Sequence, residues 1–300
     1  MKTPRIIVSL STLSLLSSIA FADGLGPANG YTIFTIESFQ ANNTDCTGRV
    51  AVGGPATYNN FGIGSALEDS DGTRDDLIVA GNLTWNNGQN FNGNVQVAGP
   101  VTMNNVGMPN GIVSDDVSID FTAAETELMS ISSMLFAATP NGVVSNTSGF
   151  LSLVGIDSEI NIFSVSQNDL SPLKGITINV PQGSSVLVNV DHNSLHLKNF
   201  ELVLIGCSST DILFNAPETN SIQVSQISWK GTILAPNASI QFNNGQIDGA
   251  LVCRSIQGNG ESHHAPFDGQ LPGDDDDLTC DCTQGEDCDC SQFLSLILYD

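Results

Sequence analysis

The chain has 300 residues, with 32 acidic side chains against 8 basic ones and a formal net charge of −24. This charge repels the phosphate backbone of nucleic acids and an anionic lipid surface, which excludes DNA- and RNA-binding functions. Charged residues make up only 13% of the chain and glycine contributes 29 residues, a composition that disfavours helical bundles and coiled coils.

Residues 1–22 have the pattern of a secretory signal peptide. Lys2 and Arg5 give a positive start, an apolar stretch follows, and Ala20-Phe21-Ala22 has the small residues of a cleavage site. We therefore expect cleavage after Ala22 and a protein that is secreted, extracellular or displayed on the cell surface. No segment has the roughly 20 apolar residues that a membrane span needs, so we expect no transmembrane segment.

A short alternating apolar strand that stops at glycine recurs after residue 23. Val79 and Val97 lie 18 residues apart, and so do Ile233 and Leu251. A strand–turn repeat of about 18 to 20 residues is the spacing of a β-solenoid rung, in which inward side chains are buried by the next rung. The sequence predicts a mainly β, right-handed parallel β-solenoid over residues 23–272, with a sandwich or barrel as the alternatives. We expect these four side chains to face its core.

Asparagine-rich pairs between the strands predict turns with left-handed backbone, which asparagine and glycine tolerate. These pairs are Asn59-Asn60, Asn87-Gly88, Asn104-Asn105 and Asn243-Asn244-Gly245. We expect them to form the corners of the solenoid.

One segment has helical rather than strand periodicity. Leu128, Ile131 and Leu135 fall on one helical face, which predicts a helix over about residues 121–137 lying against the solenoid. Thr122 and Glu125 have the spacing of a capping box, which predicts the start of this helix.

All cysteines lie in the exported part of the chain, where disulfides can form. They are Cys46, Cys207, Cys253, Cys280, Cys282, Cys288 and Cys290. The last four form two Cys-x-Cys pairs whose spacing differs from structural zinc sites, so we expect disulfides there, including disulfides between chains, rather than a thiolate metal site. Residues 273–300 form an acidic Cys-rich tail that we expect to be disordered. Glycosylation sequons occur at Asn42, Asn82, Asn146 and Asn237.

An acidic loop around Gly72 is the one candidate for cation binding. Its carboxylates alternate as in the start of a Ca²⁺ loop, and the candidate ligands are Asp69, Asp71, Asp75 and Asp76. The loop lacks the later glutamate of an EF-hand and contains Arg74. We therefore expect a solvated loop, with calcium as the alternative and no resident cofactor.

The sequence contains no recognisable catalytic constellation. No nucleophile elbow, metalloprotease motif or phosphate loop occurs, and the basic residues after the signal peptide are dispersed, at Arg49, Arg74, Lys174, Lys198, Lys230 and Arg254. Adjacent histidines occur only at His263-His264, where we expect His264 to pack at the last turn and to bond backbone carbonyls. The sequence thus predicts a protein that is not an enzyme.

The order of several short motifs resembles that of the choice-of-anchor A domain family. The motifs are Gly48-Arg49-Val-Ala-Val-Gly53-Gly54, Asp76-Leu-Ile-Val79-Ala-Gly81-Asn82, Gly93-Asn94-Val95, Gly231-Thr-Ile-Leu-Ala-Pro236-Asn-Ala238 and His264-Ala-Pro266-Phe267. The resemblance covers residues 25–272 and implies a secreted or surface-displayed adhesive domain that different proteins attach by different C-terminal devices. The run from Gly231 to Leu251 also resembles the terminal rungs of secreted ice-binding β-solenoids. The chain departs from the family in Cys46 and in a tail without bacterial sorting signals.

We therefore expect a non-catalytic adhesive module that binds an extracellular polymer, a glycan or a matrix protein. A solenoid wall would present Asn, Ser, Thr and Gln side chains at regular intervals and make many weak contacts. The alternatives are an ice-binding solenoid, which needs threonines at fixed rung positions, and a carbohydrate-active β-helix enzyme, which needs convergent carboxylates. The sequence shows no sustained threonine ladder, and it does not distinguish which face binds.

Overall fold

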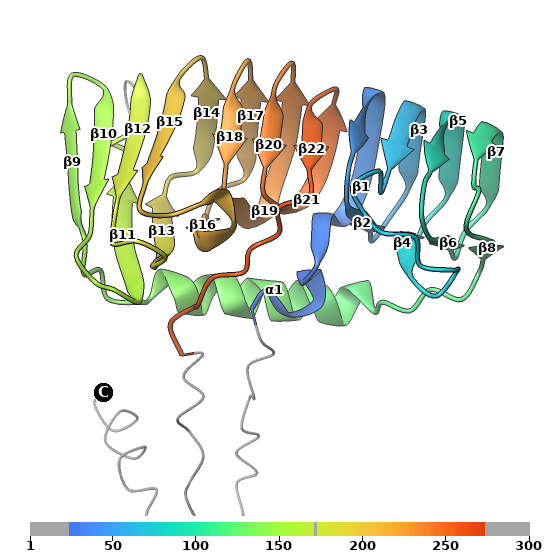
Figure 1. The fold of residues 1–300 in the computed structure, drawn as a ribbon, viewed down its shortest axis with the longest axis horizontal. Helices are drawn as coiled ribbons and strands as arrows, with labels where there is room; N and C mark the ends of the chain where they lie inside the picture. The colour runs from blue at the N-terminus through green and yellow to red at the C-terminus, as the bar shows by residue number, and fades with distance from the viewer. Residues whose placement is uncertain (1–23, 171–172, 274–300) are drawn as a thin grey trace, which may run out of the picture.

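The computed structural model describes residues 24–170 and 173–273. In this part the chain forms a β-solenoid of stacked parallel strands with one α-helix along its side (Figure 1). The strands form an 18-stranded sheet that wraps around the stack and a separate four-stranded sheet. The predicted mainly β, parallel solenoid with a flanking helix is confirmed. The signal peptide with its cleavage site, and the tail from residue 274, lie outside the described residues.

Two runs of strands flank the helix in the sequence. The first run is β1 (Tyr31–Cys46), β2 (Arg49–Val52), β3 (Ala56–Ile63), β4 (Asp75–Val79), β5 (Leu83–Asn90), β6 (Asn94–Val97), β7 (Val101–Gly107) and β8 (Val113–Ser114). Helix α1 follows at Phe121–Phe136. The second run is β9 (Val143–Thr147), β10 (Phe150–Val154), β11 (Ile160–Ser166), β12 (Gly175–Asn179), β13 (Ser185–Asp191), β14 (Ser194–Lys198), β15 (Glu201–Ile205), β16 (Ile212–Asn215), β17 (Ser221–Ser225), β18 (Ser228–Lys230), β19 (Thr232–Asn243), β20 (Gln246–Asp248), β21 (Leu251–Gly258) and β22 (Glu261–His263). Short 3-10 turns lie at η1 (Gly26–Ala28) and η2 (Ser209–Asp211).

The chain begins in the middle of the stack. Strand β1 pairs with β2 and β3 on one side and with β21 and β22 on the other, in parallel throughout. The first run builds rungs outward to β7 and β8, and α1 then carries the chain back along the stack (Figure 1). The second run starts at the far end and returns to β1. The first and last rungs are therefore neighbours.

Inward side chains stack from rung to rung in the core. Val79 pairs with Val97 and Ile233 pairs with Leu251, and all four side chains are buried. The 18-residue spacing thus marks neighbouring rungs, as predicted. Trp85 lies opposite Tyr58 with 5.6 Å between the ring centroids. Such rows are covered only by the next rung, so stacking supplies most of the burial.

Residues with left-handed backbone turn the chain at the corners. Asn60, Asn87, Asn105 and Asn244 have φ values of 48°, 56°, 52° and 50°, which confirms the predicted turn positions. Gly88 follows one of them with φ of 152°, and a Cβ atom there would lie 1.9 Å from the carbonyl oxygen of Phe61. Only glycine fits at that corner.

The start of helix α1 is fixed by an aspartate. The carboxylate of Asp120 accepts hydrogen bonds from the backbone N–H groups of Thr122 and Ala123. The predicted capping box is therefore wrong, because Asp120 is the N-cap residue and already satisfies two free N–H groups. Glu125 instead forms an ion pair with Arg254, with 2.8 Å between the charged atoms.

Helix α1 packs its predicted face against one side of the solenoid. Leu128, Ile131 and Leu135 are buried. Their cluster includes side chains that point outward from successive strands, namely Phe34, Ala51, Ile78, Leu187, Leu213, Leu234 and Val252. The helix thus covers an apolar stripe that belongs to both runs. In the described part of the chain, no helix is long and apolar enough to cross a membrane.

A buried polar network also holds the helix. The side-chain hydroxyl of Ser132 donates to Oδ1 of Asn215 at 2.6 Å, and Nδ2 of Asn215 donates to the backbone oxygen of Ser132 at 2.8 Å. Nδ2 of Asn189 donates to the backbone oxygen of Leu135 at 2.7 Å. Buried amides lose stability unless they are hydrogen-bonded, so this network favours one position of the helix along the stack.

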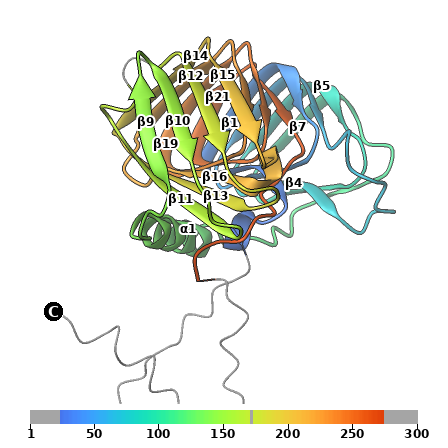
Figure 2. The ribbon, with the colours of Figure 1, turned by 60° about the vertical axis from the view of Figure 1, so that its left-hand side comes forward.

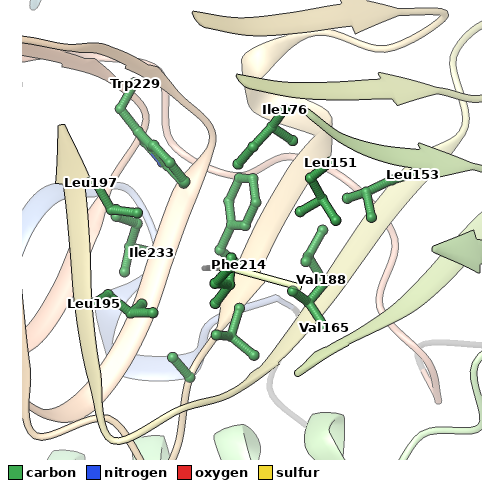
Figure 3. Close-up of a pocket in the computed structure, with 13 residues that line it drawn as sticks. Leu151, Leu153, Val165, Ile176, Val188, Leu195, Leu197, Phe214, Trp229 and Ile233 are labelled. Atoms are coloured by element: carbon green, nitrogen blue, oxygen red, sulfur yellow. The ribbon is translucent and has the colours of Figure 1, made fainter. Parts of the chain in front are cut away.

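A small apolar cavity of about 30 Å³ lies inside the second run (Figure 3). Val188, Phe214 and Trp229 are among its lining side chains. The indole N–H of Trp229 is buried without a hydrogen-bond partner among the described residues. A cavity this small with apolar walls stays dry, so it marks a site of loose packing rather than a ligand pocket.

Candidate functional site

One side of the solenoid carries straight columns of polar side chains, because parallel pairing places equivalent residues of successive rungs about 4.8 Å apart. We call this side the polar face. Its serine column is Ser194, Ser221, Ser239, Ser255 and Ser38. Its central column is His196, Gln223, Gln241, Gln257, Gln40, Thr57, Thr84 and Thr102. Its asparagine column is Asn42, Asn59, Asn86 and Asn104.

Repeated short motifs in the sequence encode these columns. Ser-Ile-Gln occurs at 221–223, 239–241 and 255–257, and Thr-x-Asn-Asn occurs at 57–60, 84–87 and 102–105. Alternate residues of a strand point to the same side, so the isoleucine of each motif turns inward while serine and glutamine turn outward. Sequence reasoning missed these motifs as a surface, although the repeat of identical tripeptides was a usable signal.

The asparagine column is hydrogen-bonded within itself. Nδ2 of Asn59 donates to Oδ1 of Asn42 at 3.0 Å, and Nδ2 of Asn86 donates to Oδ1 of Asn59 at 3.3 Å. Nδ2 of Asn104 continues the ladder to Oδ1 of Asn86 at 2.8 Å. The side-chain amides of this column therefore hydrogen-bond neighbouring rungs to one another.

The central column keeps its hydrogen-bonding groups free. Gln223, Gln241, Gln257 and Gln40 are exposed, and their amides form no side-chain hydrogen bond with any described residue. The same holds for the hydroxyl groups of the three threonines in the column. Each amide offers two donors and an acceptor to a ligand. The central column is thus the part of the polar face that is equipped to bind.

A shallow groove runs along the stack between the serine column and the central column. Its rims come from β17, β19, β21 and β1, and its floor consists of Ile222, Ile240 and Ile256. Four rungs at about 4.8 Å give a groove of about 14 Å along the axis. An extended chain lying in this groove would meet a serine and a glutamine at every rung.

The polar face carries no negative charge in its columns, although the whole chain has a net charge of −24. His196 and the neighbouring Lys198 lie toward one end of it. A ligand that contacts the glutamines therefore meets uncharged groups and avoids the cost of stripping water from a carboxylate.

The structure does not bring the predicted calcium ligands together. Asp76 is buried and pairs with Arg74, with 2.6 Å between Nε and Oδ1. Asp69 accepts a hydrogen bond from the backbone N–H of Asp71, and Asp75 lies on β4. Among the described residues, no group of three or more acidic, histidine or cysteine side chains is arranged to hold a metal ion. The calcium hypothesis gains no support from this loop.

His264 packs at the last turn, but its partners differ from the predicted ones. Its Nδ1 atom lies 3.0 Å from the hydroxyl of Thr32, and its backbone N–H donates to the hydroxyl of Thr47 at 2.7 Å. The hydrogen bonds of His264 thus go to two threonine hydroxyls, and the prediction of bonds to backbone carbonyls is wrong. Burial lowers the pKa of His264 from its usual value, and the positive charges of Arg74 and Arg49 lower it further.

His263 lies on the outside of the stack between two carboxylates. Its Nδ1 atom is 2.6 Å from Asp248, and its Nε2 atom is 3.2 Å from Glu261. Burial alone would lower the pKa of His263, but the hydrogen bonds to these carboxylates outweigh it and raise the pKa. Burial raises the pKa of the neighbouring Asp45, with a further contribution from the charge of Glu261.

The described cysteines are free thiols. Cys46 and Cys253 are buried, and Cys207 is half-buried just after β15. Burial raises the pKa of Cys46 to about 12 and that of Cys207 to about 11. The four tail cysteines lie outside the described residues, so the predicted tail disulfides stay a prediction.

The sequons differ in accessibility. Asn82 is exposed, whereas Asn42 belongs to the asparagine column. Nδ2 of Asn146 donates to the backbone oxygen of Asp169 at 2.6 Å. Nδ2 of Asn237 likewise donates to the backbone oxygen of a proline at 2.8 Å. Asn82 is therefore the sequon best placed for the predicted glycosylation.

The sequence pattern of one protein family matches most of this solenoid, over residues 24–264. The chain belongs to the ice-binding-like adhesive domain family. The prediction of an adhesive domain family is thereby confirmed. The closer assignment to the choice-of-anchor A domain family stays a prediction. No curated protein sequence matches the chain.

Several solved ice-binding proteins are distantly similar to this member of the ice-binding-like adhesive domain family. One from an Antarctic Biological Consortium is 12% identical, with 87% of this chain and 96% of that chain covered and a TM-score of 0.39. One from the Antarctic ascomycete Antarctomyces psychrotrophicus is 13% identical, with 83% and 98% covered and a TM-score of 0.34. One from Arctic yeast is 12% identical, with 83% and 96% covered and a TM-score of 0.34. These similarities are low, and the fold described above rests on the strand pairing itself.

Proposed function

We propose that this member of the family is a secreted, non-catalytic adhesive module that binds a neutral, extended extracellular polymer such as a glycan through its polar face. The observation that carries the proposal is the central column, whose four glutamines and three threonines are free of partners among the described residues. Because strand pairing already fixes their spacing, a repetitive ligand binds them with little ordering cost.

The polymer lies along the groove and meets the same pair of side chains at each rung. Each contact is weak, since the exposed amides also bond to water. Binding is therefore weak for one molecule and strong for many displayed together, because linked sites raise the effective concentration. The acidic remainder of the chain repels anionic polymers over about 8 Å at physiological salt, which favours neutral ligands.

Two observations support binding without turnover. The columns that line the groove contain no carboxylate to act as an acid or a base. The acidic side chains of the loop around Gly72 do not converge. A carbohydrate-active enzyme would need two carboxylates on either side of the ligand.

Ice binding is the second candidate, and a specific observation favours it. Thr57, Thr84 and Thr102 lie in register on neighbouring strands, so a threonine ladder of three rungs exists. The ladder ends at Gln40 on the next rung, so it is short rather than sustained. Freezing hysteresis of the purified protein distinguishes ice from a polymer as the ligand.

The deciding experiment removes the glutamines of the groove and compares displayed with monomeric protein. In the chain with Gln223→Ala, Gln241→Ala and Gln257→Ala, beads should lose binding to a neutral polysaccharide panel by about tenfold or more. Gln89→Ala with Gln246→Ala is the control, since neither glutamine belongs to a column of the polar face. Unchanged bead binding, or release of soluble sugars or peptides that depends on an acidic or histidine side chain, contradicts the proposal.

A further inference from the structure

The four-stranded sheet β9-β10-β12-β15 lies at one end of the stack (Figure 2). Several of its apolar side chains are exposed. Val143 pairs with Val154, and they are 66% and 39% exposed. The other members are Phe150, Val203 and Ile205 on the same sheet and Ile156 in the loop after β10. We call these six side chains the outer apolar face. Asn179 lies in register between Val154 and Ile205, so the exposed apolar side chains share this side of the sheet with polar ones. Exposed apolar side chains gathered on one sheet mark a contact surface.

Cations without ion pairs border the outer apolar face. The arginines in the described part all have side-chain partners: Arg49 with Tyr31, Arg74 with Asp76, and Arg254 with Glu37 and Glu125. Lys174, Lys198 and Lys230 form no ion pair with any described residue. Lys174 directly precedes β12, Lys198 ends the strand before β15, and Lys230 ends β18, which packs beside β15. The face therefore combines exposed apolar side chains with nearby unpaired lysines, and Glu201 is the carboxylate that lies in register with Phe150 on the same side of the sheet.

The described chain ends against segments that directly follow two strands of this sheet. The backbone N–H of Asp268 donates to the backbone oxygen of Thr210 at 2.9 Å, and that of Gln270 donates to the hydroxyl of Ser185 at 2.7 Å. Ser185 begins the strand that follows β12, and Thr210 lies in the turn that follows β15. The segment that leads to Gly273 runs beneath β16 and β13 (Figure 1). Gly273, the last described residue, thus lies at the end of the stack that carries the outer apolar face.

The segment that follows Gly273 in the sequence has a composition complementary to that face. Residues 274–300 hold nine acidic side chains and no lysine or arginine, and they finish with Phe293-Leu-Ser-Leu-Ile-Leu-Tyr299. Nineteen intervening residues can span up to about 60 Å, so length does not limit contact. A tethered segment of this kind experiences an effective concentration on the order of millimolar, far above that of a second chain.

We propose that the apolar segment 293–299 packs on the outer apolar face of its own chain, with the acidic residues before it against Lys174, Lys198 and Lys230. Seven extended residues are about 23 Å long and can cross four strands spaced about 4.8 Å apart. Contact buries apolar side chains on both partners, and opposite charges align the segment as it binds. This inference does not depend on what the polar face binds.

Zero-length crosslinking of the full chain tests the proposal. A carbodiimide joins a lysine amine directly to a carboxylate in contact with it, and a mixture of ordinary and ¹⁵N-labelled chains separates links within a chain from links between chains. We expect links from Lys174, Lys198 or Lys230 to acidic residues of 274–289, within single chains. Links of mixed isotope would assign the face to a second copy, and the absence of links to this segment would equally overturn the proposal.

Three variants show whether apolar packing holds the segment. The triple change Leu294→Asp, Leu296→Asp and Leu298→Asp adds carboxylates, yet should lower the yield of links by about tenfold. Val154→Asp on the face should do the same, whereas Ile112→Asp, at a position 68% exposed far along the stack, should leave the yield unchanged. Equal yields in all three would show attraction by charge alone and contradict the proposed packing.

Discussion

Nδ2 of Asn215 donates a hydrogen bond of 2.8 Å to Oδ1 of Asn189 on the neighbouring rung, and both amides are also bonded to helix α1. Both side chains are buried. The pair joins two rungs to each other and to the helix in a single network. Apolar contacts alone would allow helix α1 to shift along the stack. The hydrogen bonds of this pair give the helix one defined position relative to the rungs.

Asn215→Ala should lower the free energy of unfolding by about 1–3 kcal/mol, because it leaves buried partners on the helix and on Asn189 without hydrogen bonds. Urea denaturation measures the change. Asn104→Ala is the control at the exposed end of the asparagine column and should stay within about 0.5 kcal/mol. Equal effects of both changes would mean that the network does not hold the helix.

The stacked core predicts a second set of stabilities. Ile233→Ala and Leu251→Ala should each cost roughly 2–5 kcal/mol through lost burial and a new cavity. Because the two residues pair directly across the rungs, the double variant should depart from the sum of the single ones. Ile112→Ala, at an exposed site, is the control. Small and additive changes at both core sites would contradict the register.

The cavity of about 30 Å³ predicts a stabilising change. Val188→Ile adds a methylene to its lining and should raise the free energy of unfolding by up to about 0.7 kcal/mol, from about 24 cal/mol per Å³ of filled cavity. Val52→Ile, in a fully buried site away from the cavity, should instead destabilise by about 1–3 kcal/mol through overpacking. Thermal or urea unfolding measures both, and destabilisation by both changes would show that the cavity does not admit the added group.

The adjacent histidines predict opposite pH dependences. The pKa of His263 is raised in the folded chain, so its stabilising contribution is complete below about pH 6.5 and is lost as the pH rises through the raised value. His263→Gln should therefore reduce stability at pH 5.5, by less than about 1 kcal/mol for such an exposed pair, with no reduction at pH 9.

The pKa of His264 is lowered, so the wild type loses stability as the pH falls from about 6.5 through that lowered value. His264→Gln should remove that loss. Unfolding curves of both variants at several pH values measure the two effects, and matching pH trends would contradict the prediction.

Thiol accessibility provides a further prediction. In the reduced native chain, iodoacetamide should modify Cys207 slowly at pH 8, because burial raises its pKa to about 11 and little thiolate is present. Cys46 and Cys253 should stay unmodified until the chain unfolds, since both are buried. Peptide mapping by mass spectrometry measures the three sites separately. Rapid modification of Cys46 would contradict the placement of β1 in the core.

The sequence predicted the features that depend on local pattern. The 18-residue spacing of Val79 and Val97 indicates the length of one rung, and the asparagine pairs indicate the corners. Both signals could be recognised because each lies within a short stretch of chain. The face of α1 was predictable from Leu128, Ile131 and Leu135 for the same reason. The N-cap was missed because Asp120 and Thr122 are both good cap residues. Glu125 forms an ion pair with Arg254 instead of a capping hydrogen bond, and this tertiary contact is not visible in the local sequence.

The repeated motifs could have indicated a column within each run, but the pairing between the two runs could not be predicted. Both runs of strands have similar repeats, so nothing local tells that Gln40 of the first run lies between Gln257 of the second run and Thr57 of the first. The central column therefore exists only after the register is known. The same applies to the outer apolar face, whose valines and isoleucines are indistinguishable in sequence from inward residues of other strands.

The position of β1 between the first and last rungs has a consequence for how the chain folds. Strand β1 pairs with β21, which lies more than 200 residues later in the chain. The backbone groups of β1 that pair with β21 therefore have no partner until nearly the whole domain has been synthesised. Topologies dominated by such distant pairings fold slowly. A chain shortened before residue 251 would leave one edge of β1 with unpaired N–H and C=O groups, and such edges recruit other chains. Damage to the C-terminal rungs should therefore appear first as aggregation, through a strand at the opposite end of the sequence.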